Sequence, residues 1–256
     1  MLKSIYLSFF LLFGGFLMAQ SETTSGIEQL LDKASAQYSK RNYQEAVILY
    51  ETLLKQHQGS ADLHYNLGNS YFKCNRLAPA ILQFEKTLRL DPSNEDARFN
   101  LQLCNARIVD QLTPIGKFMI ARWYQSLGLS MSSNGWAGVS LVFFLLFSSC
   151  LIAYFLARRR WLKKTGFYVG ITSLLISILA FVYSWEAYNR LSHPDEAILF
   201  ALSVTVKSSP DGSGNDLFVL HEGTKVKIRS VLGDWSEIEL VDGNIGWLPS
   251  KDIEII

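Results

Sequence analysis

The chain of 256 residues is 49% hydrophobic and only 18% charged, and its formal net charge is +1. A nearly neutral chain has no bulk electrostatic attraction to nucleic acid, so we do not expect it to bind nucleic acid. The charged fraction lies below the roughly 25% that is usual in soluble domains, and this indicates membrane segments.

Residues 1–19 have the layout of a secretory signal peptide. Lys3 precedes an apolar stretch from Ile5 to Leu17, and the small residue Ala19 marks the expected cleavage point. The stretch is too short for a full membrane span. Because Leu17 is larger than the residue usually found two positions before the cleavage residue, an uncleaved anchor stays open as the alternative.

Residues 61–94 combine small, aromatic and proline residues at fixed intervals. The intervals are those of W-x2-L-G-x2-Y, A-x3-F and P, with His64 in place of the tryptophan. The matching residues are Leu67, Gly68, Tyr71, Ala80, Phe84 and Pro92. Gly68 and Ala80 are small enough for two helices to approach closely, and Pro92 cannot donate the next helical hydrogen bond. The segment resembles a tetratricopeptide repeat, which implies an all-α helical hairpin.

A weaker copy of the same pattern covers residues 27–60. Its small and aromatic positions are taken by Ala34, Ala46 and Tyr50, and Gln58 replaces the proline. Residues 95–112 then continue as one further helix, which would cap the stack. The apolar residues of that helix recur at helical spacing: Ala97, Leu101, Cys104 and Ile108. We expect a helical repeat domain over residues 27–112 that folds on its own.

Tetratricopeptide repeats bind other proteins, and in that family the first helix of each repeat lines a concave groove. The residues that would face the groove here are Asn66, Asn69, Lys73, Asn100 and Arg107. The alternative is that these are ordinary solvated helix positions. The subtype that captures a C-terminal carboxylate has Lys or Arg one turn before the groove asparagine. Tyr65 and Phe99 stand there instead, so carboxylate capture is not expected.

Residues 113–135 connect the repeats to an apolar segment. Its apolar residues recur at helical spacing, with Lys117 and Arg122 among them: Ile115, Phe118, Met119, Trp123 and Leu127. This pattern predicts an amphipathic helix that lies in a membrane interface. A core helix packed against the repeats is the alternative.

Two uncharged apolar runs follow, at residues 136–157 and 165–185. Each is long enough to cross a bilayer core about 30 Å thick. Residues 158–164 between them hold five cations, which predicts a cytoplasmic loop. Both flanking regions would then lie outside, in agreement with the signal peptide. We expect two transmembrane helices in a bacterial inner membrane, with both soluble domains in the periplasm.

Over residues 197–256 the apolar period changes to two, which predicts short strands. Ser236-Glu-Ile-Glu-Leu240 is one such segment, and Asp242-Gly243 marks a tight hairpin turn. The order of landmarks resembles a bacterial SH3-like domain: Val204–Pro210, Leu217–Gly223, Gly233-Asp-Trp235 and Gly246-Trp247-Leu248. The resemblance implies a small all-β barrel that recognises cell-wall peptides or protein segments. Trp235 and Trp247 would contact the ligand, unless they are core aromatics.

The sequence carries no recognisable reaction chemistry. The four histidines lack metal-ligand spacing, and no nucleophile or phosphate-loop motif occurs. The three cysteines form no C-x-x-C motif. Cys150 lies in an apolar run, whereas Cys74 and Cys104 could pair if their helices touch. We therefore expect no enzyme, no catalytic residue, no metal site and no cofactor.

The order of segments predicts a multidomain membrane protein: signal peptide, repeats, two spans around a cation-rich loop, and SH3-like domain. With Ser133-Asn-Gly-Trp136 and Phe218-x-Leu-x-Glu-Gly223, this order resembles the BatE type of the Bacteroides aerotolerance family. The resemblance implies a Bacteroidetes inner-membrane scaffold. Its partners would be Bat membrane proteins with von Willebrand A domains, linked to a MoxR-type ATPase, and its role would be envelope stress or oxygen tolerance.

Two other functions stay open. One is a cell-wall sensor in which the SH3-like domain binds peptidoglycan peptides and the spans only anchor it. The other is a transporter or channel subunit. The lack of charged residues within either apolar run disfavours a transport path.

Overall fold

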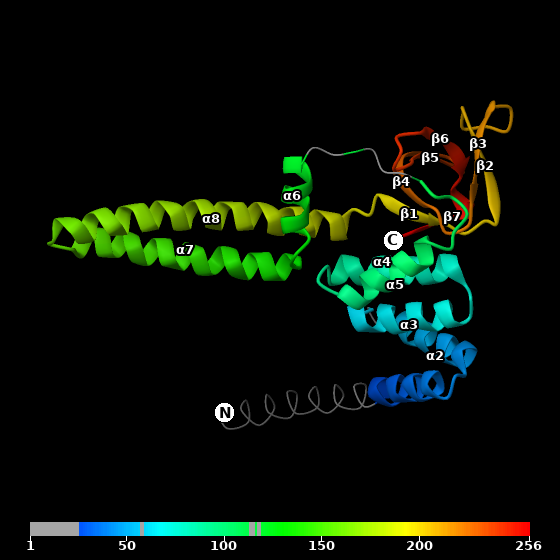
Figure 1. Ribbon diagram of the computed structural model, residues 1–256, viewed down its shortest axis with the longest axis horizontal. Coiled ribbons are helices and arrows are strands. Elements are labelled where there is room, and N and C mark those ends of the chain that lie inside the picture. The colour runs from blue at the N-terminus through cyan, green and yellow to red at the C-terminus, as the bar shows by residue number, and fades with distance from the viewer. Residues whose placement is uncertain (1–25, 57–58, 113–115, 117–118) are drawn as a thin grey trace, which may run out of the picture.

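The computed structural model describes residues 26–56, 59–112, 116 and 119–256, and it has three parts (Figure 1). A stack of helices occupies residues 26–105, and an antiparallel sheet of residues 196–255 lies against it. We call the stack and the sheet together the body. A hairpin of two long helices projects away from the body. The expected signal peptide, residues 1–19, lies outside the described residues.

The helices of the stack pair in sequence order. They are the helix over residues 26–39, α2 (Tyr43–Gln56), α3 (Ala61–Lys73), α4 (Leu77–Leu90) and α5 (Glu95–Asn105). The turns before α2 and before α4 are alike, because Arg41 and Asn75 have positive φ angles of 64° and 59°. Few residues other than glycine adopt this conformation. Two turns of the same unusual geometry at equivalent positions indicate two copies of one helical hairpin.

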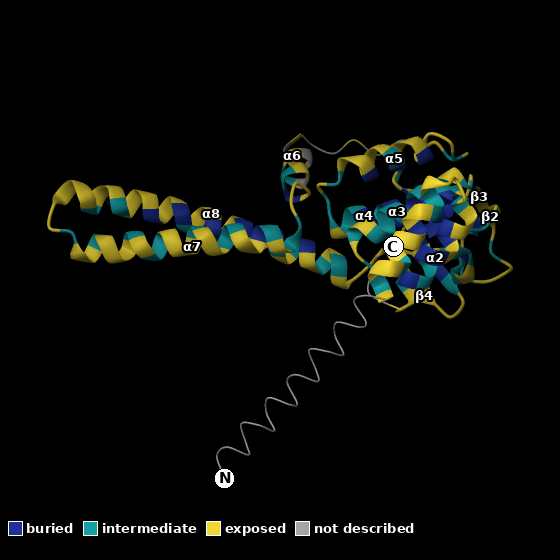
Figure 2. Cartoon of the chain, turned by 90° about the horizontal axis from the view of Figure 1, so that it is seen from below, coloured by how far each residue is buried: buried dark blue, intermediate teal, exposed yellow. Residues whose placement is uncertain are grey.

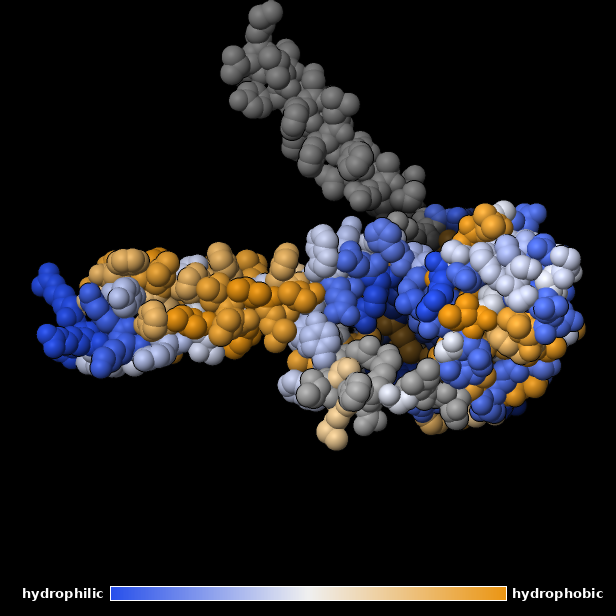
Figure 3. All heavy atoms as spheres, turned by 90° about the horizontal axis from the view of Figure 1, so that it is seen from above, coloured by the Kyte–Doolittle hydropathy of each residue, from blue (hydrophilic) through white to orange (hydrophobic). Residues whose placement is uncertain are grey.

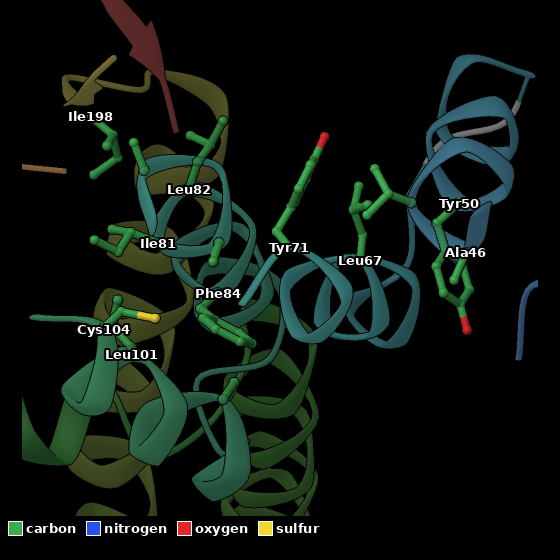
Figure 4. Close-up of a cluster of buried hydrophobic side chains, with 14 of the residues drawn as sticks. Ala46, Tyr50, Leu67, Tyr71, Ile81, Leu82, Phe84, Leu101, Cys104 and Ile198 are labelled. Atoms are coloured by element: carbon green, nitrogen blue, oxygen red, sulfur yellow. The ribbon is translucent and has the colours of Figure 1, made fainter. Parts of the chain in front are cut away.

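Small residues let aromatic side chains fill the space between the stacked helices (Figure 4). Ala46, Ala80 and Phe84 have no exposed surface. Gly68 of α3 lies directly against the Phe84 ring, and a Cβ added to Gly68 would stand 2.8 Å from Phe84 Cε1. This close approach gives a physical reason for glycine at position 68.

The expected capping helix over residues 95–112 is too long, because α5 ends at Asn105. Gln111 turns back, and its Nε2 donates hydrogen bonds to the carbonyl oxygens of Asn105 (3.1 Å) and Ile108 (3.0 Å). The first of these bonds satisfies a carbonyl group that the helix end leaves without a partner. After α5 the chain turns toward the sheet, and Asp110 accepts hydrogen bonds from it.

The hairpin consists of α7 (Ser133–Leu156) and α8 (Arg160–Ser192), which are long and apolar enough to cross a membrane by length and composition. Most of its surface is exposed (Figure 2). Only residues 157–159 link the two helices, because the cation-rich segment becomes helical at Arg160. We call residues 157–164 the tip. At the other end α8 continues past the expected span, to Ser192, and reaches the body.

Pairs of serines hold α7 against α8. Ser140 Oγ donates to the Ser177 carbonyl oxygen (3.0 Å), and Ser177 Oγ donates back to the Ser140 carbonyl oxygen (2.9 Å). Ser133 and Ser184 form the same reciprocal pair, at 3.0 Å in each direction. The two serines of each helix are one heptad apart, so both pairs lie on one seam. Small residues at such a seam allow helix backbones to approach closely.

The C-terminal part is a seven-stranded antiparallel sheet with the strand order β3-β2-β6-β5-β4-β1-β7. Its strands are β1 (Glu196–Leu199), β2 (Ser203–Lys207), β3 (Asp216–His221), β4 (Lys225–Leu232), β5 (Trp235–Glu239), β6 (Ile245–Pro249) and β7 (Ile253–Ile255). Strand β5 buries Ser236 and Ile238 and turns the alternate side chains outward. The predicted β structure of this region is confirmed.

The sheet docks on α4. Ile198 of β1 and Ile256 join the hydrophobic core of the helical stack, and Figure 4 places Ile198 beside Ile81 and Leu82. Consequently α4 is buried continuously from Ala78 to Phe84. A repeat fragment cut at residue 112 would expose this apolar side of α4. We therefore no longer expect the repeats to fold on their own.

The substitution Gly68→Leu is expected to destabilise the protein, because the new side chain must displace the buried Phe84 ring. Overpacking of this kind typically lowers the free energy of unfolding by about 1–3 kcal/mol. Thermal unfolding followed by circular dichroism at helical wavelengths measures the change. Gly212→Leu is the matched control, since nothing lies within 4 Å of a Cβ added there. Equal melting temperatures of the two variants would contradict the packing.

Candidate functional site

One face of the stack is formed by α3 and α5, and four of the five predicted groove residues lie on it or at its edge. Asn100 Nδ2 donates a hydrogen bond to Asn69 Oδ1 at 2.8 Å, which joins the two helices. Lys73 is exposed one turn after Asn69. The guanidinium carbon of Arg107 lies 4.7 Å from the centre of the Phe72 ring. This face, which we call the concave face because it holds the predicted groove residues, therefore carries amides and cations next to an aromatic ring.

Sequence reasoning missed the apolar part of the concave face. Phe99 of α5 is 59% exposed, and Leu103, one turn later, is exposed as well. The fifth predicted residue, Asn66, is half-buried one turn before Asn69. A signal for Phe99 was present, because Leu31, Tyr65 and Phe99 occupy equivalent positions in successive repeats. Exposed aromatic and aliphatic groups beside amides suit a protein partner.

The two tryptophans of the sheet share one outward face. In the ladder between β5 and β6, Trp235 lies opposite Pro249 and Trp247 lies opposite Glu237. Opposed residues point to the same side of a sheet, as do residues two apart in one strand. All four side chains therefore lie on one face, while Leu248 points into the core. Both tryptophans are half-buried, so neither is a core aromatic.

A polar junction that the sequence did not reveal joins the stack to the sheet at Asp110. Its carboxylate accepts hydrogen bonds from the backbone N–H of His221 (2.7 Å) and the hydroxyl of Thr224 (2.7 Å). His221 Nδ1 lies 2.9 Å from the other carboxylate oxygen. Burial alone would raise the pKa of Asp110, but these hydrogen bonds outweigh it and hold the pKa below its usual value.

A second polar contact at the junction centres on Lys225 of β4. Its ammonium lies 3.0 Å from the carboxylate of Glu85 on α4 and 2.8 Å from that of Glu196 on β1. Burial alone would lower the pKa of Lys225, but the two carboxylates outweigh it and raise the pKa above its usual value. The ammonium therefore stays charged and ties the sheet to α4.

Arg89 of α4 links all three parts of the molecule. Its guanidinium donates hydrogen bonds to the carbonyl oxygens of Ile256, Arg190 and Leu191, the last at 2.8 Å. The carbonyl groups of Arg190 and Leu191 belong to the last turn of α8, where a cation is favourable because the helix dipole is negative. The end of the hairpin is thus fixed to the body.

The cysteines and the metal-ligating side chains add no further centre to the described part of the chain. All three cysteines are described and are free thiols, so Cys74 and Cys104 do not pair. Burial raises the pKa of Cys104 to about 11, which leaves its thiol protonated and unreactive at neutral pH. Within the described residues, no three His, Cys, Asp or Glu side chains gather as a metal site would require.

Comparison with protein families matches residues 61–94 to the family described as tetratricopeptide repeat. The chain contains a tetratricopeptide repeat. The prediction for this segment is confirmed, and α3 and α4 are its two helices. No curated protein matches the chain. Among solved structures, the crystal structure of MamA matches with 16% sequence identity and a TM-score of 0.28, over 62% of this chain and 96% of that chain.

The junction between the helical stack and the sheet is expected to weaken in acid. Because the pKa of Asp110 is depressed in the folded protein, its carboxylate stabilises the fold above its ordinary pKa near 4. This stabilisation is lost as the pH falls through the folded-state pKa. Asp110→Asn should therefore be less stable than the wild type at pH 7, and the difference should shrink below pH 4.

Urea unfolding at a series of pH values measures this difference. Asp32→Asn is the matched control, because Asp32 is exposed on the first helix, outside the junction. If the gap between Asp110→Asn and the wild type stays constant from pH 7 to pH 3, the carboxylate does not hold the junction.

Proposed function

We propose that the protein is a non-enzymatic scaffold that two transmembrane helices anchor in a bacterial inner membrane. Its repeats bind partner proteins on the periplasmic side. The matched tetratricopeptide repeat supports protein binding. The observation that carries the proposal is the concave face, where Phe99 is exposed beside the Asn69–Asn100 pair. Among the described residues, Phe99, Leu103 and Lys73 of this face are exposed, whereas the sheet covers α4 of the same stack.

Membrane insertion is supported by the surface of the hairpin. Figure 3 shows a hydrophobic band along the hairpin, with a hydrophilic tip at one end and the body at the other. Large apolar side chains such as Leu141, Phe144 and Phe155 are exposed on it. In water this surface would be unfavourable, whereas in a bilayer lipid tails cover it. The five cations of the tip favour a cytoplasmic location and a periplasmic body.

A topology test examines this arrangement in cells. A reporter enzyme that is active only in the periplasm should be active when it is fused after Ile256, because the body would be outside. The same reporter fused after Arg160, in the tip, should be inactive. A cytoplasmic reporter at both positions is the control and should give the reverse pattern. Activity of the periplasmic reporter at the tip, with none after Ile256, would overturn the proposed orientation.

The proposed partners are Bat-family membrane proteins with von Willebrand A domains, in an envelope-stress or aerotolerance complex. Their capture should depend on the concave face, so Phe99→Ser should reduce co-purification of such a partner at least tenfold. Truncation of an aromatic side chain that is a hot spot of an interface costs about 2 kcal/mol or more, and a tenfold loss of affinity needs about 1.4 kcal/mol. Crosslinking in membranes followed by mass spectrometry of the captured proteins gives the measurement.

The control for this substitution is Ile48→Ser, which removes a similarly exposed apolar side chain from α2, outside the concave face. It should leave partner capture unchanged. If Phe99→Ser captures the same von Willebrand A proteins in the same amounts as Ile48→Ser, the concave face is not the contact surface.

A cell-wall sensor is the second proposed function, and the shared outward face of Trp235 and Trp247 favours it. Paired aromatic rings on a sheet surface can stack against sugar rings or peptide groups. Retention of muropeptides by the intact protein, with no protein partner captured by the concave face, would favour the sensor over the scaffold.

A further inference from the structure

Helix α6 (Met119–Gly128) lies at the end of the hairpin next to the body, just before α7 in the chain. In Figure 1 it runs crosswise to α7 and α8. Of the residues that predicted an amphipathic connector, Met119, Trp123 and Leu127 belong to α6, whereas Ile115 and Phe118 lie outside the described residues. A helix that crosses the end of two proposed spans would run parallel to the membrane surface.

One side of α6 is fixed to the hairpin by an aromatic cluster of Tyr124, Trp136 and Tyr183. The centre of the Tyr183 ring lies 4.8 Å from that of Tyr124 and 4.9 Å from that of Trp136. Trp136 Nε1 donates a hydrogen bond to the carbonyl oxygen of Gly128 at 3.2 Å. Leu127 packs against the same cluster. Packing against the hairpin therefore fixes the position of α6.

The other side of α6 has no protein partner among the described residues. Met119 is 77% exposed and Trp123 is 70% exposed, and their spacing of four residues puts them on one face of the helix. Leu129 and Trp185, at the same end of the hairpin, are exposed as well. No aspartate or glutamate occurs in α6. Ser126 is exposed on the same side, so the described part of this face consists of two large apolar side chains and one hydroxyl.

We propose that this face of α6 lies in the headgroup region of the bilayer, with Met119 and Trp123 inserted among the lipids. The proposal rests on the proposed insertion of α7 and α8. Indole rings prefer the interface between hydrocarbon and water, and an amphipathic helix lies there with its apolar face toward the acyl chains. The crosswise direction of α6 and its fixed level at the end of the hairpin fit this position.

If α6 lies at the membrane surface, then the aromatic cluster marks the outer boundary of the hydrocarbon. The last turns of α8, from Glu186 to Ser192, then stand in water and carry the body directly above the headgroups. Arg89, which binds the carbonyl groups at the end of α8, would hold the body at that height.

Spin labels test the depth of α6 in the full chain. Single cysteines at positions 119 and 123 are labelled in a variant with Cys74, Cys104 and Cys150 replaced by alanine, reconstituted in phosphatidylethanolamine and phosphatidylglycerol vesicles. Contact with oxygen, which dissolves in lipid, is compared with contact with a water-soluble nickel complex. Leu145→Cys in mid-α7 is the control for hydrocarbon, and Leu202→Cys, at an 80% exposed position just before β2, is the control for water.

The ratio of oxygen contact to nickel contact measures the depth of a label. Labels at positions 119 and 123 should give a ratio between those of the two controls, as expected for the headgroup region. A ratio equal to that at 202 would overturn the inference. Low contact with both reagents would also overturn it, because the face would then be covered by protein, for example a second copy. If the label at 145 also behaves as in water, the hairpin itself is not inserted, and the proposed function fails first.

A second measurement keeps the native cysteines. Fluorescence quenching by lipids brominated near the headgroup is compared between the native chain and Trp123→Phe. The native chain should lose more fluorescence, and the difference is the contribution of Trp123. Trp235→Phe is the control, because Trp235 lies in the sheet and would not contact lipid. This variant should lose the same absolute amount of fluorescence on quenching as the native chain. Equal quenching of the native chain and Trp123→Phe would overturn the inference.

Discussion

The burial of α4 on two sides is the constraint on which the rest of the structure depends. One side of α4 packs against α3, where Gly68 lies on the Phe84 ring. The other side of α4 receives Ile198 and Ile256 from the C-terminal part of the chain. A helix buried this way cannot shift without opening two interfaces. Arg89, near its C-terminal end, also binds the last carbonyl groups of α8. The repeats, the sheet and the end of the hairpin are therefore joined through one helix.

This arrangement changes how the parts can work together. Separate domains on linkers would search for partners independently, whereas here the concave face and the outward tryptophan face are held at fixed positions in one body. The junction is closed by charged groups that satisfy one another, such as Lys225 between Glu85 and Glu196. These ion pairs are only partly buried, and partly exposed pairs contribute little to net stability, so we expect them mainly to orient the sheet on α4. A partner that binds the concave face would thus be held at a defined place relative to the hairpin.

Local patterns predicted what depends on neighbours in the chain. The spacing from Gly68 to Pro92 predicted the repeat, and the alternation from Ser236 to Leu240 predicted a strand with Ile238 inside. The end of α5 at Asn105 could not be predicted, because the partners of Asp110 are more than 100 residues away in the chain. For β6, the alternation of Trp247 with Leu248 left the inward face ambiguous. Only the pairing with β5 decides that Trp247 faces out.

The most direct test of this account is segment-resolved hydrogen exchange of the full chain in lipid nanodiscs at increasing urea concentration. If α4 joins the repeats and the sheet into one body, the backbone amides of α4 and β1 should exchange through the same opening. Their free energies of opening and their urea dependences should then coincide. Exchange of β1 at a clearly lower free energy, while α4 stays protected, would show that the sheet opens independently and would contradict the account.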